Sequence, residues 1–330
     1  MRKRIVDLSF GEEPLLDIGA YSRGMRVVTR ARRLQIALTV HRAPEVMVKV
    51  SGGAKTLAGV GTHIAYVGRE GELGVEMDNG TRVDGKGFEQ QVISDWDLDI
   101  EELDWRSAAP DPRRKPVKLV HNLIFSMPPG TSPNAVLKAV KKLAVNEWAL
   151  RHRYALALHT DEKHPHVHVV LKAMSEQGER LNIRKATLRA WRAQFAENLR
   201  ELGVTANATE RAVRGQSRTY KKDPIYRAER RGDSRFVDGR RTEVMRDLAA
   251  GKLQGEKGRV ALERTREDVR AGWRQIAAIL KSSGDYELAN SARAFESRMS
   301  PPRTDKEWLA RDTVRGSIEQ TAKQREPLTR

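Results

Sequence analysis

Histidines are concentrated in one short segment of this chain. Four of the eight histidines lie between residues 159 and 168, in the order His-Thr-Asp-Glu-Lys-His-Pro-His-Val-His. Alternate side chains of a strand point to the same face, so His166 and His168 share one side while the apolar residues beside them face a core. His159 ends the preceding apolar run, and a short antiparallel connection would bring it alongside them. The pattern therefore predicts three imidazoles that converge on one point.

Three converging imidazoles are typical of a metal site. Neutral imidazoles suit a divalent ion (Mn, Mg or Zn) that keeps open positions for a phosphate oxygen. Asp161, in the connecting loop, is expected to orient one ring through its second nitrogen. A strand histidine without a ligand is the ordinary alternative for a single histidine, but a His-apolar-His pair beside a third histidine has no packing purpose. His121 is either a hydrogen-bond donor behind the ligands or a buried core histidine.

The composition restricts the partners and the compartment. Lys and Arg number 61 against 44 Asp and Glu, so the net charge is +17 and a phosphate-rich partner such as nucleic acid is expected. The absence of cysteine excludes disulfides, thiolate metal sites and thiol nucleophiles, and it fits a reducing compartment. No apolar run approaches the roughly 20 residues of a membrane span, and the N-terminus lacks the apolar core of a signal peptide. We therefore expect a cytoplasmic protein without membrane insertion.

Apolar runs and turn residues predict the elements that position the histidines. Short runs rich in β-branched residues predict strands, and longer runs with helical periodicity predict helices. The turn-rich, acidic residues 71–116 are expected to form an insertion or a hairpin. The predicted strands are 46–50, 117–126, 154–159 and 166–172, and the predicted helices are 56–69, 132–151 and 185–202.

Several of these segments resemble the mobilisation relaxases. Residues 159–172 are similar to the third motif of that family, in which two histidines flank a hydrophobic residue. Gly-Gly-Ala-Lys-Thr-Leu at 52–57 and Tyr-Val-Gly-Arg-Glu-Gly at 66–71 resemble its first motif, and residues 121–131 resemble its central strand and turn. The similarity is greatest to relaxases that nick T-DNA borders, and it extends to residues 209–220, which resemble the end of the domain.

The resemblance implies both a fold and a reaction. The fold is α+β, with a central antiparallel sheet flanked by helices, metal-binding His159, His166 and His168 on its middle strands, and the nucleophile Tyr66 on a nearby helix. Attack by this phenol on a phosphodiester gives a 5′-phosphotyrosine and a free 3′ hydroxyl. A phenol is mostly protonated at neutral pH, so it needs a base, a cation or a metal field, and Asp161 and His121 are the predicted bases.

The implied substrate is single-stranded DNA at a transfer origin, during conjugative mobilisation of a plasmid or an integrative element. Accessory relaxosome proteins and a type IV coupling protein are the further partners implied, and the protein could reach a recipient cell while bound to DNA. Trp191 is expected to stack on a base. The residues expected to contact DNA phosphates are Lys55, Arg69, Lys172, Arg184, Lys185, Arg211, Arg214 and Arg218.

The chain is expected to consist of four segments. A basic N-terminal extension, 1–43, contains a predicted strand at 34–40, and the relaxase nuclease domain covers 44–220. A basic linker, 221–257, precedes a helical C-terminal region, 258–330. The first helix of that region is predicted from the heptad-like spacing of four apolar residues: Val269, Trp273, Ile276 and Leu280.

Three other functions fit parts of the sequence. A rolling-circle replication initiator would share the histidines and the tyrosine chemistry. Many such initiators carry a second tyrosine one helical turn away, where this chain has Thr62 and Glu70, and their tyrosine usually follows the histidines, whereas Tyr66 precedes them. A non-catalytic DNA-binding relaxosome component would need only the charge. A metal-dependent hydrolase that uses water would release its product without a covalent adduct.

Overall fold

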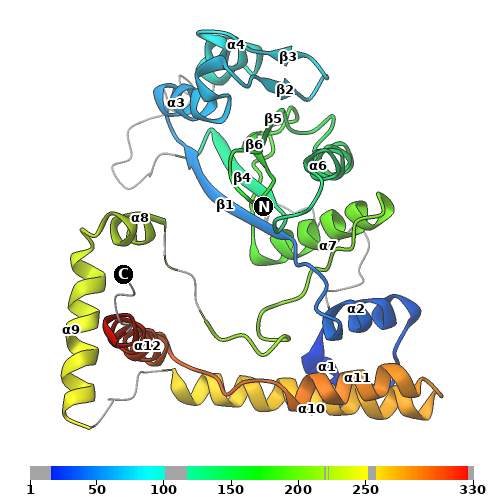
Figure 1. Cartoon of the computed structure of the whole chain (residues 1–330). Helices are drawn as coiled ribbons and strands as arrows, with labels where there is room; N and C mark the ends of the chain where they lie inside the picture. The colour runs from blue at the N-terminus through cyan, green and yellow to red at the C-terminus, as the bar shows by residue number, and fades with distance from the viewer. Residues whose placement is uncertain (1–15, 101–116, 219–220, 222, 252–257, 326–330) are drawn as a thin grey trace, which may run out of the picture. The chain divides into compact units, whose positions relative to one another are not determined.

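The computed structural model describes residues 16–100, 117–218, 221, 223–251 and 258–325 (Figure 1). These residues form two compact units. The sheet unit consists of residues 41–208, and the helical unit combines residues 16–40 with the chain from 209 onward. The expected N-terminal extension is therefore divided, because its residues from 16 to 40 pack within the helical unit. The domain end expected at residue 220 lies outside the described residues.

One antiparallel sheet of six strands forms the centre of the sheet unit, which confirms the predicted α+β fold. The strand order is β1-β4-β6-β5-β2-β3. The two strands that carry the histidine cluster therefore lie side by side in the middle of the sheet. The strands are β1 (Met47–Ala54), β2 (Val75–Met77), β3 (Arg82–Val83), β4 (Val120–Ser126), β5 (Tyr154–His159) and β6 (His166–Lys172).

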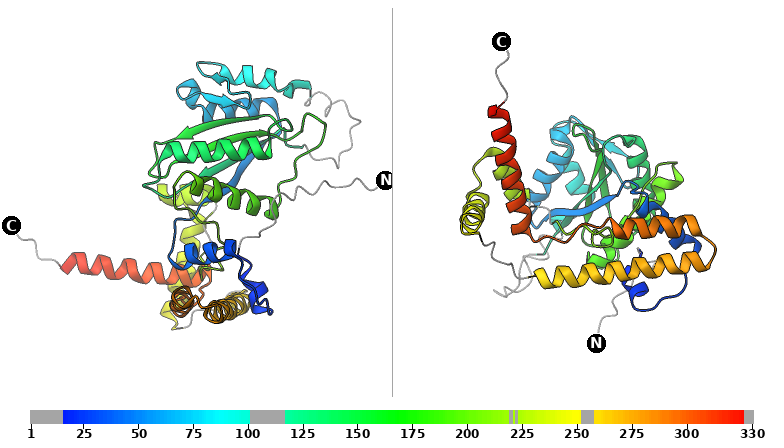
Figure 2. Two further views of the ribbon diagram at one scale, coloured as in Figure 1. Left: turned by 90° about the vertical axis from the view of Figure 1, so that its right-hand side faces the viewer. Right: turned by 60° about the horizontal axis from the view of Figure 1, so that its bottom comes forward.

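Helices cover both faces of this sheet (Figure 2). Helices α6 (Pro133–Glu147) and α7 (Lys185–Glu201) pack on one face, against a core that includes the alternate, fully buried residues Val167, Val169 and Leu171 of β6. Helices α3 (Leu57–Val67) and α4 (Phe88–Asp95) pack on the other face. The alternation predicted for β6 is thus confirmed, because its odd-numbered residues face α6 and α7 while the histidines face the opposite side.

A capping residue fixes the start of helix α3, and a row of buried apolar residues fixes the face that packs on the sheet. The hydroxyl of Thr56 caps its N-terminus by accepting a hydrogen bond from the backbone N–H of Gly59 at 3.2 Å. Val60, Ile64 and Val67 recur at helical spacing and are fully buried, so they fix the face that α3 presents to the sheet. Tyr66 lies beside this buried row, one residue before the helix ends.

The segment after α3 contains the predicted hairpin. A short 3-10 helix, η1 (Arg69–Gly71), leads into β2 and β3, which pair with each other antiparallel. Strand β2 also pairs with β5, so the hairpin extends the sheet beyond the histidine strands. Residues 101–116, the rest of the acidic stretch, lie outside the described residues.

The helical unit has its own core. The long helix α10 buries Val269, Trp273, Ile276 and Leu280, as their spacing predicts. Gly272 is required on the same helix, because a Cβ there would lie 2.3 Å from the carbonyl oxygen of Ile18 in α1. The helices of this unit are α1 (Ile18–Ser22), α2 (Arg30–Val40), α8 (Asp223–Arg231), α9 (Arg235–Ala249), α10 (Arg259–Ser282), α11 (Tyr286–Ser297) and α12 (Asp305–Arg325).

The prediction of a strand at 34–40 is wrong, because these residues belong to helix α2. Their β-branched and apolar residues also fit a helical face, on which Ile36 and Val40, four residues apart, are buried in the core shared with α10 and α11. Packing in a distant part of the chain therefore decided the secondary structure of this segment.

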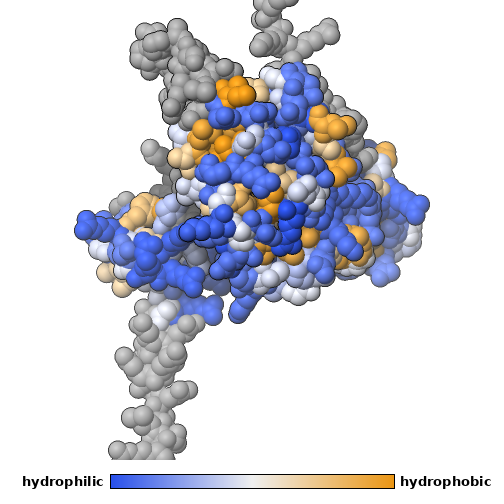
Figure 3. Space-filling view, turned by 90° about the horizontal axis from the view of Figure 1, so that it is seen from above, coloured by the Kyte–Doolittle hydropathy of each residue, from blue (hydrophilic) through white to orange (hydrophobic). Residues whose placement is uncertain are grey.

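Within the described ranges, no helix is both long and apolar enough to cross a membrane. On the face drawn in Figure 3, apolar side chains form separate patches among hydrophilic ones.

Candidate functional site

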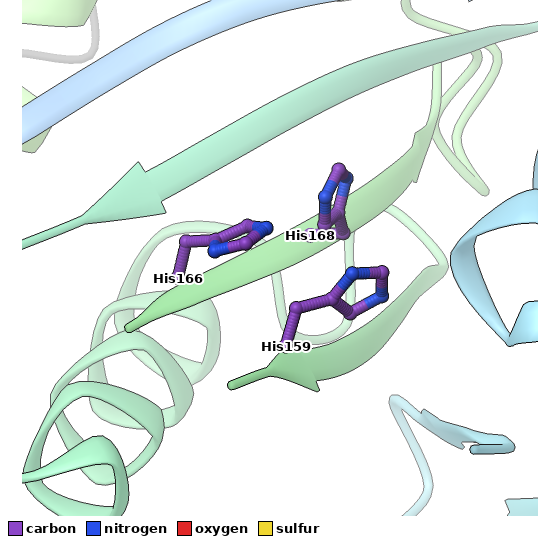
Figure 4. A group of neighbouring side chains, drawn as sticks. All are labelled: His159, His166 and His168. Carbon is purple, nitrogen blue, oxygen red and sulfur yellow. The ribbon is translucent and has the colours of Figure 1, made fainter. Parts of the chain in front are cut away.

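The three predicted ligand histidines meet on one face of the sheet (Figure 4). His159 at the end of β5 pairs directly with His166 at the start of β6, and His168 follows on the same face. The ring centroids are 5.2 Å apart for His159 and His166, 4.4 Å for His159 and His168, and 5.1 Å for His166 and His168. One ring nitrogen from each histidine lies within 4.8 Å of the other two. The cluster could therefore bind one metal ion.

Backbone carbonyl groups orient two of these rings. Nε2 of His159 donates a hydrogen bond to the carbonyl oxygen of Val67 at 2.7 Å, which leaves Nδ1 as the nitrogen with a lone pair. Nδ1 of His166 donates to the carbonyl oxygen of His164 at 3.0 Å, which leaves Nε2. Nδ1 of His168 is buried without a hydrogen-bond partner among the described residues. Hydrogen-bonded rings with one remaining lone pair, beside an unsatisfied buried nitrogen, fit a divalent cation.

The surroundings keep the rings of His159 and His168 neutral. Burial, assisted by the neighbouring His159 and His166, lowers the pKa of His168 to about 3. Burial also lowers the pKa of His159, although its hydrogen bond to Val67 acts in the opposite direction. A neutral imidazole is the form that binds a metal, so His159 and His168 can bind an ion at neutral pH without first losing protons.

Tyr66 lies beside the histidine cluster. Its ring centroid is 6.2 Å from that of His168, with the two ring planes at 81°. The side chain is 56% exposed, so a substrate can reach the phenol from solvent. The next residue along α3, Val67, accepts the hydrogen bond from His159, and this contact ties the end of the helix to the cluster.

A second contact ties the turn after α3 to the loop between β5 and β6. The guanidinium of Arg69 forms an ion pair with the carboxylate of Asp161. The hydrogen bond that Arg69 donates to Asp161 in this pair is the main reason why the pKa of Asp161 lies below its ordinary value. Among the described residues, Asp161 forms no hydrogen bond with a ring of the histidine cluster, so the structure does not support the expectation that it orients a ring. The carbonyl groups of Val67 and His164 orient two of the rings instead. Asp161 instead holds the turn that follows Tyr66.

His121 lies on the wrong face of the sheet for a role as base. It pairs with Leu171, and directly paired residues of antiparallel strands point to the same side. That side faces α6 and α7, away from the histidine cluster and Tyr66. Burial lowers its pKa to about 4, with the charge of Lys118 adding to the effect. The prediction of His121 as the base is therefore wrong, and its alternative role as a core histidine fits.

Two residues at the site were not predicted from the sequence. His63 lies one helical turn before Tyr66, with ring centroids 6.3 Å apart and planes at 28°. Its Nε2 is buried without a hydrogen-bond partner in the described part of the chain, and burial lowers its pKa to about 4. Lys49 of β1 lies in register with Ile124, which in turn pairs with His168. Its positive charge contributes to the lowered pKa of His168.

The residues predicted to bind DNA are dispersed over both units. Lys55 is exposed just before α3, and Arg184 and Lys185 are exposed where α7 begins. Arg69 is the partner of Asp161. The other predicted contacts in the helical unit are Arg211, Arg214 and Arg218.

Two of the predicted DNA contacts have structural roles instead. Lys172 is buried, and its ammonium group lies 3.3 Å from the carboxylate of Glu176, so it does not offer a free cation. Trp191 is only 2% exposed, and its indole N–H donates to Glu147 at 3.1 Å. The expectation that Trp191 stacks on a base is therefore wrong, because the ring is part of the core beneath α7.

Part of the chain is similar to known proteins. Residues 84–204 match the family model of the relaxase nuclease domain, MobA/VirD2-like. The T-DNA border endonuclease VirD2 of Rhizobium radiobacter is 28% identical over 187 residues, which cover 52% of this chain and 43% of the relative. VirD2 of Agrobacterium fabrum (strain C58 / ATCC 33970) is also 28% identical, over 52% of this chain and 41% of its own. VirD2 of Rhizobium rhizogenes is 27% identical.

The central part of the sheet unit is therefore similar to the relaxase nuclease domain of the MobA/VirD2-like type. The matched segment includes all three clustered histidines and begins after Tyr66. The matched regions span less than half the length of these relatives. The predicted role of Tyr66 consequently rests on its motif and on its position beside His168.

Proposed function

We propose that this chain is a relaxase that nicks one DNA strand at a transfer origin, with Tyr66 as the nucleophile. The observation that supports this function best is the position of an exposed tyrosine ring 6.2 Å from His168, on the same side of the sheet as three histidines suited to a metal ion. Most tyrosines are packing residues, and a packing role would bury the ring rather than expose it beside a metal site.

The reaction is a transesterification. The phenol oxygen of Tyr66 attacks the scissile phosphorus, a bond forms between them, and the bond from phosphorus to the 3′ oxygen breaks. The departing 3′ oxygen takes up a proton and becomes a free hydroxyl, while the 5′ phosphate stays on the tyrosine. A bound divalent ion would polarise the non-bridging phosphate oxygens and offset the negative charge that develops there.

The residues around Tyr66 determine how the phenol loses its proton. Asp161 is held by Arg69, and the pKa of His63 is lowered to about 4, so neither is a strong base. The exposure of Tyr66 allows its proton to pass to water. Nε2 of His63 has no hydrogen-bond partner among the described residues, so we propose that it accepts one from the phenol once substrate is bound.

The ligand set favours particular metals. His159, His166 and His168 supply three nitrogen ligands, which suit Mn or Zn better than Mg, since Mg prefers oxygen. We therefore propose Mn or Zn as the tightest-binding ion. Nicking should stop after treatment with a chelator and return on addition of Mn.

The decisive experiment detects the covalent adduct. Purified protein is incubated with a labelled single-stranded oligonucleotide from the transfer origin and with Mn, and the products are separated on a denaturing gel. The Tyr66→Phe variant should form no adduct, whereas Tyr286→Phe, which changes a comparably exposed tyrosine in the helical unit, should form as much as the wild type. Nicked DNA without any adduct would instead identify a hydrolase, and unaltered DNA bound to the wild type would identify a non-catalytic component.

The setting we propose is conjugative mobilisation of a plasmid or an integrative element. The protein would act on origin DNA in the cytoplasm, with accessory relaxosome proteins and a type IV coupling protein, and would enter the recipient attached to the transferred strand. Transfer of an origin-bearing element should be lost when the gene is deleted. The wild-type gene should restore it and the Tyr66→Phe gene should not; equal restoration by both would contradict the proposal.

A further inference from the structure

Three arginines surround one tryptophan in the helical unit. The guanidinium carbons of Arg218, Arg303 and Arg311 lie 5.3, 5.2 and 5.3 Å from the ring centroid of Trp308, in the first turn of α12. We call these four residues the arginine cage. Ser217 fixes its geometry, since its hydroxyl accepts a hydrogen bond from the backbone N–H of Arg303 at 3.0 Å and donates one to the carbonyl oxygen of the same residue at 3.1 Å.

The arginine cage holds more positive charge than its neighbours neutralise. Arg218 forms an ion pair with Asp312 at 2.7 Å. Within the described ranges, no carboxylate lies at ion-pair distance from Arg303 or Arg311. Like charges held around one ring repel one another, and their contacts with the indole offset only part of that cost. An anion bound between the guanidinium groups would remove the repulsion.

The chemistry of the cage identifies the class of anion. A guanidinium presents a planar fork of N–H donors that matches two phosphate oxygens, and contact with the indole restrains that fork before a ligand arrives. The side chain of Arg218 is 55% exposed and Arg311 is exposed, so a long polyanion can reach them. Because the guanidinium groups already lie over the indole, the cage offers cations rather than a stacking surface. This arrangement suits the sugar-phosphate backbone and not the bases.

We propose that the arginine cage is a DNA-binding site of the helical unit, which holds backbone phosphates of a single strand independently of sequence. It is distinct from the nicking centre in the sheet unit and does not depend on cleavage. A net charge of +17 on the whole chain supports the same partner, because a polyanion is drawn to such a surface.

The test measures how DNA binding depends on salt. Full-length protein is titrated against a fluorescent single strand of about 30 nucleotides that lacks an origin sequence, at salt concentrations between about 50 and 200 mM. The Arg303→Gln/Arg311→Gln variant should bind about tenfold more weakly. The negative slope of log affinity against log salt should become shallower by about 1.4, because two phosphate contacts are lost. Arg264→Gln/Arg293→Gln is the matched control, since it removes two exposed arginines from α10 and α11 and changes the net charge equally.

Two results would overturn the proposal: an unchanged slope in the cage variant, or an equal loss in the control variant. A measurement on the wild type covers the case in which the cage variant folds poorly. Phenylglyoxal modifies accessible arginines, and mass spectrometry reads each position. The oligonucleotide should slow modification of Arg303 and Arg311 severalfold and leave Arg264 and Arg293 unaffected. Equal rates at all four positions, with and without DNA, would refute the site.

Discussion

The turn after helix α3 offers a test that separates stability from activity. Arg69 and Glu70 are consecutive residues in the left-handed region, with φ of 51° and 53°. Only glycine adopts that conformation without steric cost. Arg69 has a further role, because its guanidinium binds Asp161 and so holds the turn against the loop between the histidine strands. Replacing each residue by glycine removes the same backbone strain, but only one replacement removes the ion pair.

The expected magnitudes follow from these contacts. Relief of left-handed strain is worth about 1–2 kcal/mol per residue, and the greater freedom of glycine in the unfolded chain offsets about 0.5–1 kcal/mol of it. Glu70→Gly should therefore stabilise the domain by about 0.5 kcal/mol or slightly more. Arg69→Gly also loses an ion pair whose side chains are 38% and 47% exposed, and such a pair contributes at most about 1 kcal/mol. Its net effect on stability should be close to zero.

Activity should separate the two variants much more clearly than stability does. Without the ion pair the end of α3 is less restrained, and displacement of the phenol by even about 1 Å can slow a reaction by about 10- to 100-fold. The assay combines thermal denaturation with the single-turnover rate of adduct formation. Arg69→Gly should lose at least about tenfold in rate, and Glu70→Gly should keep the wild-type rate. Equal rates for both variants, whether retained or lost, would refute the positioning role of the Arg69–Asp161 contact.

Four further predictions address the histidines and Lys49. His168→Gln should weaken Mn binding by more than about 100-fold in calorimetric titration, whereas the exposed loop variant His164→Gln should bind like the wild type. Burial lowers the pKa of His121 from 6.5 to about 4, so the stability from its neutral ring is fully present above pH 6.5 and is lost as the pH falls towards 4. Urea denaturation near pH 7 and at about pH 4.5 should show a loss of stability that is smaller in His121→Leu than in the wild type by on the order of 2 kcal/mol, since His63 and His168 contribute losses of their own in both proteins. Lys49→Gln should slow adduct formation by about tenfold with little change in Mn affinity, and a normal rate would exclude this residue from the reaction. His63→Phe keeps a ring beside Tyr66 but removes Nε2, so it should slow nicking severalfold; an unaltered rate would show that the nitrogen is not used.

Local patterns were sufficient to predict the histidine cluster. The alternation of His166 and His168 with buried valines sets their common face, and the short loop to His159 requires an antiparallel neighbour. The same alternation, applied to the strand of His121, places that residue on the opposite face, but only once the register with β6 is known. A shift of one residue reverses the face, so the register decides the role.

Contacts between distant segments were beyond the reach of sequence patterns. Lys49 lies on β1, which is next to β4, and β4 is next to the histidine strand β6. No local spacing in the sequence indicates this strand order. Residues 34–40 form a helix because they pack into the core of the helical unit. His63 had a readable signal in its position three residues before Tyr66 on a predicted helix, since such residues are neighbours on the helix surface.

Peptide mapping of the adduct can show whether Tyr66 forms the covalent bond to DNA. After the reaction with origin DNA and Mn, the adduct is digested with nuclease and trypsin and analysed by tandem mass spectrometry. Cleavage after Lys55 and Arg69 gives a peptide of residues 56–69, in which Tyr66 is the only tyrosine. We expect a nucleotide-phosphate mass on that tyrosine. The modification on any other residue, or nicked DNA with peptide 56–69 unmodified, would contradict it.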